Sequence, residues 1–394
     1  MKLRPLIGVL AFASAAAVIP AAAAPFVPTS DSQIVERLPF TASDPAIRQL
    51  RLLHDALSKE PDNLPLALRL ARGYLELGRA TSDPRYGGYA QAALAPWWEL
   101  ASPPREVLVL RAALRQRVHL FDAALADLAI VVEADPRDAQ AHLMRATVLQ
   151  VVGQFDAARA ECLALQGLTK EIVWTVCLAG VNAMTGRLHE SYEQLRTALD
   201  RFPTAQPQIK SWALTSLGEM AARAQQPREA ERHFRDALAI DPTDNYLLGA
   251  FADFLLDQDR PGEVENLLRG YTRADPLLLR FALALQAQRS PDLPTWIAQL
   301  RDRFEASHLR GDRVHLREEA RFILQLLNDP GAALTLARQD WRVQKEPADV
   351  RILLEAAIAA RSAADEATAR DWLRLTRFED ASLPPAGNSN PSKN

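Results

Sequence analysis

Residues 211–242 read SWALTSLGEMAARAQQPREAERHFRDALAIDP, and this stretch decides the fold. Gly218 and Ala230 are small residues, one in each half of the stretch. A helix hairpin of this size closes only where both helices carry a small side chain at their nearest approach. Phe234 follows Ala230 by one helical turn, so it fills the gap toward the next hairpin. Pro242 marks the end of the second helix, because proline cannot continue helical hydrogen bonding. The stretch therefore predicts an antiparallel pair of helices.

The same pattern recurs at a nearly constant spacing through the middle of the chain. The first small position holds Ala112, Ala146, Ala179, Gly218 and Ala252, at spacings of 34, 33, 39 and 34 residues. At the same spacings, the second small position holds Ala124, Ala158, Ser191, Ala230 and Val264, and the boundary position holds Pro136, Lys170, Pro203, Pro242 and Pro276. A short insertion over residues 206–210 accounts for the long spacing. Three columns in one register indicate five repeated hairpins.

This pattern resembles the tetratricopeptide repeat family, whose units have the same period. The fourth unit carries the resemblance best, with Leu217-Gly218, Ala230, Phe234, Ala237 and Pro242. The resemblance is clear over residues 105–278. It implies an all-α fold, a right-handed superhelical solenoid of antiparallel helix hairpins that works by binding another protein.

Helical periodicity continues on both sides of the five units, but the repeat residues are lost there. We expect atypical N-terminal helix hairpins over 46–104 and divergent C-terminal helical repeats over 279–380, about nine hairpins in all. Residues 80–88 are expected to form a loop, because they contain Asp83, Pro84, Gly87 and Gly88. Residues 24–45 are expected to be an extended linker, and residues 381–394 a disordered tail rich in Pro, Gly, Asn and Ser.

The N-terminus has the order of a secretory signal. Lys2 and Arg4 precede an apolar run over residues 6–19, and small residues follow at 21–24. We expect a signal peptide over 1–23, and therefore a periplasmic or secreted protein. The apolar run could instead remain as an anchor helix, although it is shorter than a membrane span requires. The preference for Arg over Lys favours a bacterial origin with a GC-rich genome.

The composition is that of a globular helical protein without a basic field. Hydrophobic residues make up 48% of the chain and charged residues 24%, and the formal net charge is -3. Nucleic-acid binding requires a concentration of positive charge that this chain lacks. We therefore expect a protein or peptide partner and no nucleic acid.

No pattern of residues predicts catalysis. The seven histidines are scattered, and only one group, formed by Glu305, His308, Asp312, His315 and Glu319, comes near to metal-ligand spacing. Gly311 interrupts the helix that would align these side chains, so a solvated charged surface is the better interpretation. The sequence contains no Gly-x-Ser-x-Gly motif and no phosphate-binding glycine motif. We expect no catalytic residues, no cofactor, no metal and no enzymatic activity.

The two cysteines, Cys162 and Cys177, fall on helices expected to be neighbours, the second helix of one unit and the first helix of the next. In an oxidising compartment they could form a structural disulfide. Alternatively, Cys162 is simply a small core residue in the gap-filling column.

The family resemblance also implies where partners bind. In tetratricopeptide repeats the first helices line a concave groove, and contacts come from set positions in each unit. In units three to five these positions correspond to Val173, Val176, Met184, Trp212, Thr215, Glu219, Arg223, Tyr246, Asp253 and Asp257. Trp212 and Tyr246 would be rigid anchors of the kind enriched at interfaces, or else residues half-buried against neighbouring helices.

The sequence thus predicts a protein-protein interaction scaffold or adaptor of the bacterial cell envelope. An alternative is a secreted enzyme or ligand-binding protein with its site in the divergent N- or C-terminal units. That alternative predicts a deep polar pocket with strongly perturbed titratable groups. A third hypothesis is self-assembly into a structural oligomer.

Overall fold

The computed structural model describes residue 30, residues 44–311 and residues 314–385, in which twenty helices and no strands occur. The first four helices are α1 (Pro45–Lys59), α2 (Leu64–Thr81), α3 (Arg85–Ala93) and α4 (Ala95–Trp98). The predicted signal segment and most of the predicted linker lie outside the described residues. Within the described residues, no helix is both long enough and apolar enough to cross a membrane.

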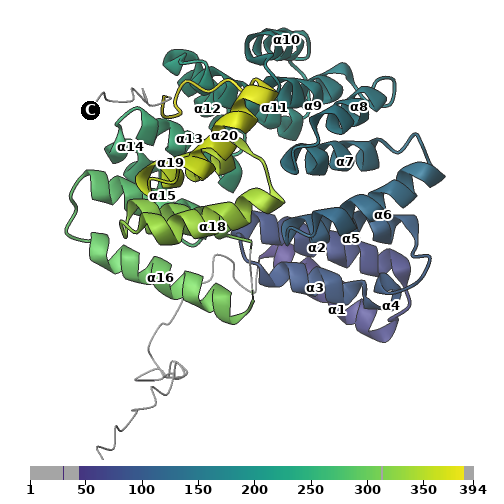
Figure 1. Ribbon diagram of the computed structural model, residues 1–394. Helices are drawn as coiled ribbons and strands as arrows, with labels where there is room; N and C mark the ends of the chain where they lie inside the picture. Colours follow the sequence, from purple (N-terminus) through teal and green to yellow (C-terminus); the bar gives the residue numbers. More distant parts are fainter. Residues whose placement is uncertain (1–29, 31–43, 312–313, 386–394) are drawn as a thin grey trace, which may run out of the picture.

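Ten helices form the five predicted repeats, in consecutive pairs (Figure 1). They are α5 (Arg105–Arg117), α6 (Phe121–Ala134), α7 (Ala139–Val151), α8 (Phe155–Ala164), α9 (Glu171–Ala183), α10 (Leu188–Arg201), α11 (Pro207–Arg223), α12 (Pro227–Ile240), α13 (Asn245–Asp257) and α14 (Pro261–Leu268). Six further helices follow: α15 (Asp275–Ala287), α16 (Leu293–Leu309), α17 (Leu316–Gln325), α18 (Pro330–Val343), α19 (Pro347–Ala359) and α20 (Ala363–Thr376). The fold is an all-α solenoid of tetratricopeptide-like hairpins.

The small residues of the two repeat columns are buried where the paired helices meet. Gly218 and Ala230 lie on α11 and α12, and Phe234 packs over the glycine. A Cβ atom added to Gly218 would lie 2.8 Å from the Phe234 ring, closer than carbon atoms can approach. Phe234 is itself only 1% exposed and is surrounded by Phe251 and Phe254. The hairpin therefore closes at a contact that tolerates no side chain.

The expected loop over residues 80–88 is wrong in its extent. Helix α2 continues to Thr81, and Gly87 and Gly88 lie inside α3, so only Ser82 to Pro84 connect the two helices. Glycine costs a helix only about 1 kcal/mol per residue. Packing outweighs that cost, because α3 buries Ala90 and Ala93 in the N-terminal core.

The C-terminal helices turn back onto the middle of the solenoid. In Figure 1, α18, α19 and α20 lie across the repeats rather than extending the stack away from them. One apolar cluster contains Phe155 of α8, Val181 of α9, Ala337 of α18 and Leu353 of α19. Burial of this shared apolar surface favours the closed arrangement.

Two glycines permit the close approach of the returning chain. Gly153 and Gly186 end the first helices of the second and third repeats at φ +80° and +77°, a left-handed conformation that other residues adopt at a cost. A Cβ atom at either position would lie within 3.0 Å of the side chain of Lys345 or Arg377. The backbone N–H of Lys345 also donates to the carbonyl of Val151 at 2.7 Å.

The expected disorder of the tail is wrong for its first residues. The N–H of Ala381 donates to the carbonyl of Arg223 at 3.1 Å. Arg370 on α20 donates to the carbonyls of Pro384 and Pro385 at 3.2 and 2.8 Å. Residues 381–385 are thus held by α11 and α20, while residues 386–394 lie outside the described residues.

The close contact at Gly218 gives a test of the repeat packing. Replacement of Gly218 by Ala is expected to lower the free energy of unfolding by about 1–3 kcal/mol, because the new methyl group overpacks the core against Phe234. The matched control is Gly88→Ala, at an exposed position of α3 where an added Cβ meets nothing within 4 Å. That change should raise the free energy of unfolding by about 0.5–1 kcal/mol. Urea unfolding measures both, and equal effects of the two substitutions would contradict the packing described.

Candidate functional site

A central cavity of about 970 Å³ lies between the middle repeats and the returning C-terminal helices. The first helices of four successive repeats, α7, α9, α11 and α13, form one side of it. Helices α17 and α19 form much of the opposite side, and Arg79 of α2 and Asp380 of the C-terminal segment complete the lining. The concave face of the solenoid is therefore the wall of a cavity.

Nine of the ten groove residues predicted from the sequence line this cavity. They are Val176, Met184, Trp212, Thr215, Glu219, Arg223, Tyr246, Asp253 and Asp257. The tenth, Val173, does not line the cavity but packs against the apolar core around α9 to α13. The concave-face positions implied by the family resemblance thus converge in space.

The sequence analysis missed the charged residues that the C-terminal helices contribute. They are Arg317, Glu318 and Arg321 of α17, Glu346 directly before α19, and Arg351 and Glu355 of α19. They are distant in sequence from the repeats that they face, and they carry no repeat signature. Arg280 of α15 was missed as well, because it lies just beyond the five units.

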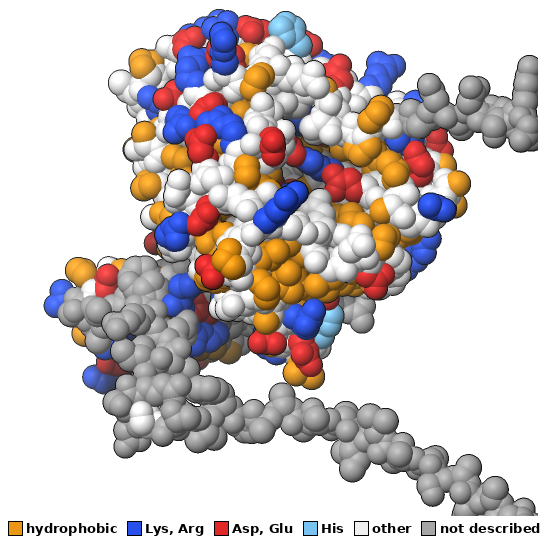
Figure 2. Space-filling model, turned by 90° about the vertical axis from the view of Figure 1, so that its left-hand side faces the viewer, with side chains coloured by type: hydrophobic (Ala, Val, Ile, Leu, Met, Phe, Trp, Pro, Cys, Tyr) orange, Lys and Arg blue, Asp and Glu red, His pale blue; other side chains and the backbone are white. Residues whose placement is uncertain are grey.

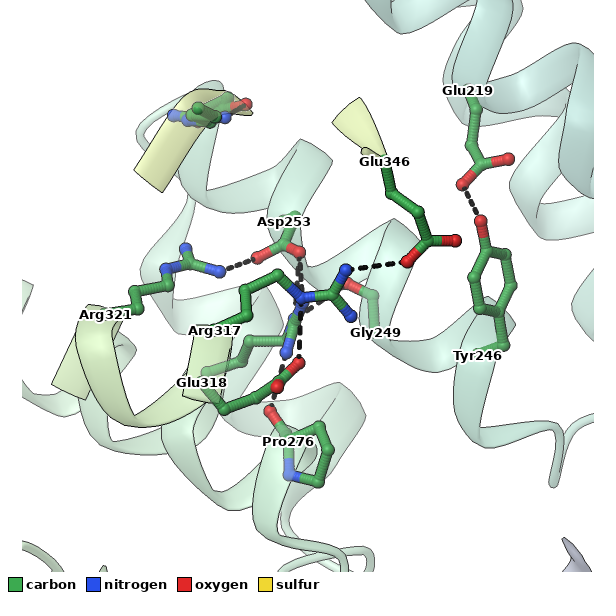
Figure 3. Close-up of polar contacts among 12 residues, drawn as sticks. Glu219, Tyr246, Gly249, Asp253, Pro276, Arg317, Glu318, Arg321 and Glu346 are labelled. Carbon is green, nitrogen blue, oxygen red and sulfur yellow. Dashed lines mark hydrogen bonds and ion pairs between the residues drawn. The ribbon is translucent and has the colours of Figure 1, made fainter. Parts of the chain in front are cut away.

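Asp253 joins the repeats to the C-terminal helices (Figure 3). Its carboxylate accepts hydrogen bonds from Arg280 at 2.5 Å and from Arg321 at 2.6 Å. Burial alone would raise the pKa of Asp253, but the two guanidinium groups hold it far below its usual range. Asp253 is therefore ionised and links α13 to α15 and α17.

Arg351 and Arg317 make two further links. Arg351 donates to both carboxylate oxygens of Asp257 at 2.7 Å, a bidentate pair of the stronger kind. Arg317 donates to Glu346 at 2.8 Å and to the buried Asp349 at 3.0 Å. The guanidinium group of Arg317 also lowers the pKa of Glu318 to about 2, against the effect of burial.

Glu219 and Tyr246 form a separate pair within the same cavity. The Tyr246 hydroxyl donates to the Glu219 carboxylate at 2.6 Å, and Figure 3 shows the pair apart from the arginine cluster. Burial raises the pKa of Glu219 to about 7, an effect that the Tyr246 hydroxyl only partly offsets. The charge of Glu219 and burial together raise the pKa of Tyr246 well above its usual value. Each group therefore carries a proton below pH 7, whereas above it only the Tyr246 hydroxyl remains protonated.

The accessible surface of both aromatic anchors faces the cavity. Tyr246 is 64% exposed and Trp212 is 37% exposed, and both side chains line the cavity, which is partly open to solvent. Among the described residues, neither ring stacks on another aromatic ring or lies under an arginine. Both rings therefore lie at the surface of the cavity, where Tyr246 is largely exposed and Trp212 is partly buried.

Cys162 and Cys177 form a disulfide between α8 and α9. Both side chains are buried in the apolar cluster shared with the C-terminal helices. Cys177 also lies beside the cavity. The bond joins the second and third repeats at the surface on which α18 to α20 pack.

Among the described members of the histidine group that came near to metal spacing, His308 Nε2 contacts the Glu319 carboxylate at 2.8 Å. Asp312 lies outside the described residues. Among the residues described, no three metal-ligating side chains gather at one point. Trp97 and Trp98 pack against the N-terminal core.

The comparisons with known proteins concern architecture only. No protein-family model matches the sequence, and no curated protein matches it significantly. Similar solved structures include a tetratricopeptide repeat protein from Parabacteroides merdae, at 14% identity over 69% of this chain and 98% of that chain, with a TM-score of 0.37. They also include yeast Tom70, at 12% identity over 84% and 83% of the two chains, with a TM-score of 0.41. A monomeric mutant of IFIT1 with Gppp-AAAA is similar at 14% identity over 84% and 76%, with a TM-score of 0.48. With scores this low, the repeat assignment rests on the helices and packing of this chain itself.

Two aspartates, Asp340 and Asp349, form a buried pair behind the cavity wall. Asp340 of α18 is 3% exposed, and its Oδ2 atom has no hydrogen-bond partner. Asp349, at the start of α19, is fully buried. Burial raises the pKa of Asp340 strongly, and the nearby charge of Asp349 raises it further. The folded protein therefore holds a proton on this pair under conditions in which the unfolded chain releases it.

This pair predicts a pH dependence of stability with a definite sign. A carboxyl group whose pKa is raised by folding favours the folded state at low pH, and that contribution is lost as the pH rises. Replacement of Asp340 by Asn keeps a neutral hydrogen-bonding group in the same space. We expect the substitution to raise the free energy of unfolding at pH 8 but to change it little at pH 4. Urea unfolding between these values tests this, with exposed Asp236→Asn as the control, and a loss of stability at pH 8 would contradict the proton assignment.

Proposed function

We propose that the protein is a non-catalytic binding scaffold of a bacterial cell envelope, and that it binds a short segment of a partner protein in the central cavity. The observation that carries this proposal is the convergence of nine concave-face side chains of the repeats in one cavity. Two of them, Trp212 and Tyr246, present aromatic surface to it. Rigid aromatic side chains of this kind dominate binding energy at protein interfaces.

The size of the cavity limits what it can receive. About 970 Å³ lies at the upper end of ordinary ligand pockets. Helices α17 and α19 stand opposite the repeats, so an extended peptide does not have the whole concave face available. A segment of a few residues, such as a loop tip or a chain terminus, is the form of partner that fits.

The charge of the lining disfavours nucleic acid. Nine carboxylate side chains and six guanidinium groups line the cavity. The face of the molecule in Figure 2 carries acidic and basic side chains in a mixed pattern, and hydrophobic side chains gather in its lower part. Phosphate backbones bind where positive charge predominates. The signal-like residues at the N-terminus, Lys2 and Arg4 before an apolar run, support a place in the envelope.

One observation favours a second candidate, a secreted enzyme or a protein that binds a small ligand. The cavity is enclosed by divergent C-terminal units, and it contains Glu219, whose pKa is raised to about 7. Perturbed acids in pockets are a feature of ligand and catalytic sites. The scaffold proposal remains first because the cavity is built from the recognition positions of successive repeats.

Selection from a displayed library of random heptapeptides on the purified protein tests the proposal. We expect enriched peptides whose affinity falls at least tenfold in the Trp212→Ala variant, because the aromatic anchor is lost. Ile130→Ala is the control, since Ile130 is 52% exposed and does not line the cavity. If no peptide is enriched, or if enriched peptides bind the Trp212→Ala variant unchanged, the cavity is not a peptide site.

A further inference from the structure

The guanidinium groups that line the cavity are already engaged by acceptors of the protein. Arg280 and Arg321 share Asp253, and Arg351 is bidentate to Asp257. Arg317 donates to Glu346 and Asp349. An anionic ligand would have to displace these carboxylates. The arginines therefore do not form a ready site for a phosphate or a carboxylate.

Arg223 and Arg79 are also engaged. Arg223 donates to the carbonyls of Ala183 at 2.5 Å and Glu379 at 3.0 Å, and its guanidinium group lies 4.2 Å from the centre of the Phe378 ring. Arg79 lies 3.5 Å from Asp244. Although Arg223 is one turn from Glu219 on the same helix, its hydrogen bonds go to backbone oxygens of α9 and the C-terminal segment.

Glu219 forms no ion pair among the described residues, although the charge of nearby Arg223 favours its ionised form. Among the described residues, its carboxylate accepts a hydrogen bond from the Tyr246 hydroxyl, which is neutral. By contrast, Asp253 and Asp257, the two acids that bridge the repeats and the C-terminal helices, each have at least one arginine within 2.7 Å. A carboxylate that is surrounded by protein and lacks a cation favours binding of a positive group from outside.

Aromatic surface adjoins this carboxylate. Trp212 precedes Glu219 by seven residues on α11, so the two side chains lie two turns apart on one helix face. Tyr246 occupies the position equivalent to Trp212 in the next repeat, 34 residues later. Both rings present open surface to the cavity. The charge of a cationic side chain can pair with this carboxylate, and its aliphatic stem can pack on the aromatic rings.

We propose that the cavity recognises a Lys or Arg side chain of the bound segment, whose charged end pairs with Glu219 while its stem packs on Tyr246 and Trp212. This inference rests on the proposed function and specifies the chemistry of the partner. The specificity comes from the arrangement of charge: Glu219 forms no ion pair and lies next to aromatic surface, whereas each arginine of the lining donates to an acceptor of the protein. Asp241 and Asp380 of the lining also form no ion pair, but they accept hydrogen bonds from Thr243 and Ser382.

A pH dependence of binding follows. Glu219 faces Tyr246 and Asp253 from α13, Arg223 from its own helix and Glu346 from the start of α19. In the free protein its pKa is about 7, so a large fraction is neutral at pH 6. A bound cation favours the ionised form and lowers this pKa. Affinity for a cationic side chain should therefore rise between pH 6 and pH 8 and then level off.

Single-residue probes test the proposal on the full chain. The probes are the Nα-acetyl amides of lysine, arginine, norleucine and glutamate, and the signal is the ¹⁹F resonance of Trp212 in protein labelled with 5-fluorotryptophan, assigned through Trp212→Phe. We expect saturable shifts with the lysine and arginine amides, and at least tenfold weaker binding of norleucine amide, which has a similar stem without charge. Glu219→Gln should weaken the lysine amide about ten- to a hundredfold and remove the pH dependence.

The control variant is Glu305→Gln, an exposed acid on α16 that does not line the cavity. Four outcomes would each overturn the proposal. Two concern the probes: norleucine or glutamate amide binds as well as lysine amide, or lysine amide gives no response. The other two concern Glu219: the pH profile of the unmodified protein is flat, or a folded Glu219→Gln variant binds unchanged. Selection of Trp212-dependent heptapeptides without Lys or Arg would also overturn it while leaving the proposed scaffold function intact. Failure of the heptapeptide selection itself would instead count against the scaffold function.

Discussion

The structure depends on the apolar contact between the C-terminal helices and the second and third repeats. An ordinary solenoid leaves its concave face open, because each unit contacts only its neighbours. Here α18, α19 and α20 share a buried cluster with α8 and α9, next to the disulfide of Cys162 and Cys177. Glycines at the two hairpin turns allow the returning chain to approach closely. This contact places the C-terminal helices opposite the concave face, so the groove becomes a partly open cavity.

The closure also determines the electrostatics of the interior. Carboxylates on the concave face would be solvated in an open groove, and their pKa values would stay near the ordinary range. The returning helices place Arg321 and Arg351 against Asp253 and Asp257, and the arginines beside Asp253 keep that acid ionised. They place no arginine against Glu219, and the same enclosure raises the pKa of that group to about 7. Ion pairing thus lowers the pKa of Asp253, whereas burial raises the pKa of Glu219 on the same wall of the cavity.

The sequence analysis was most successful where a residue has a local role. Gly218 and Ala230 are required by the contact within one hairpin, and their spacing repeats with the hairpin, so they could be identified from the chain alone. Of the ten concave positions that the same register located, nine line the cavity. It failed where packing overrode local preference, as at Gly87 and Gly88, which are helical because α3 buries its alanines. It failed likewise at Ala381, which is held by a hydrogen bond to Arg223 across the fold.

The sequence by itself determined the helical hairpins, their number in the central array and the face that each first helix turns inward, because these follow from residues a few positions apart. Only the tertiary structure decided that the inward face is a cavity and which of its charges are neutralised. Arg321 and Asp253 are separated by 68 residues, and nothing in the repeat pattern relates them. Their contact results from the path of the whole chain, which is set by burial of apolar surface between elements far apart in sequence.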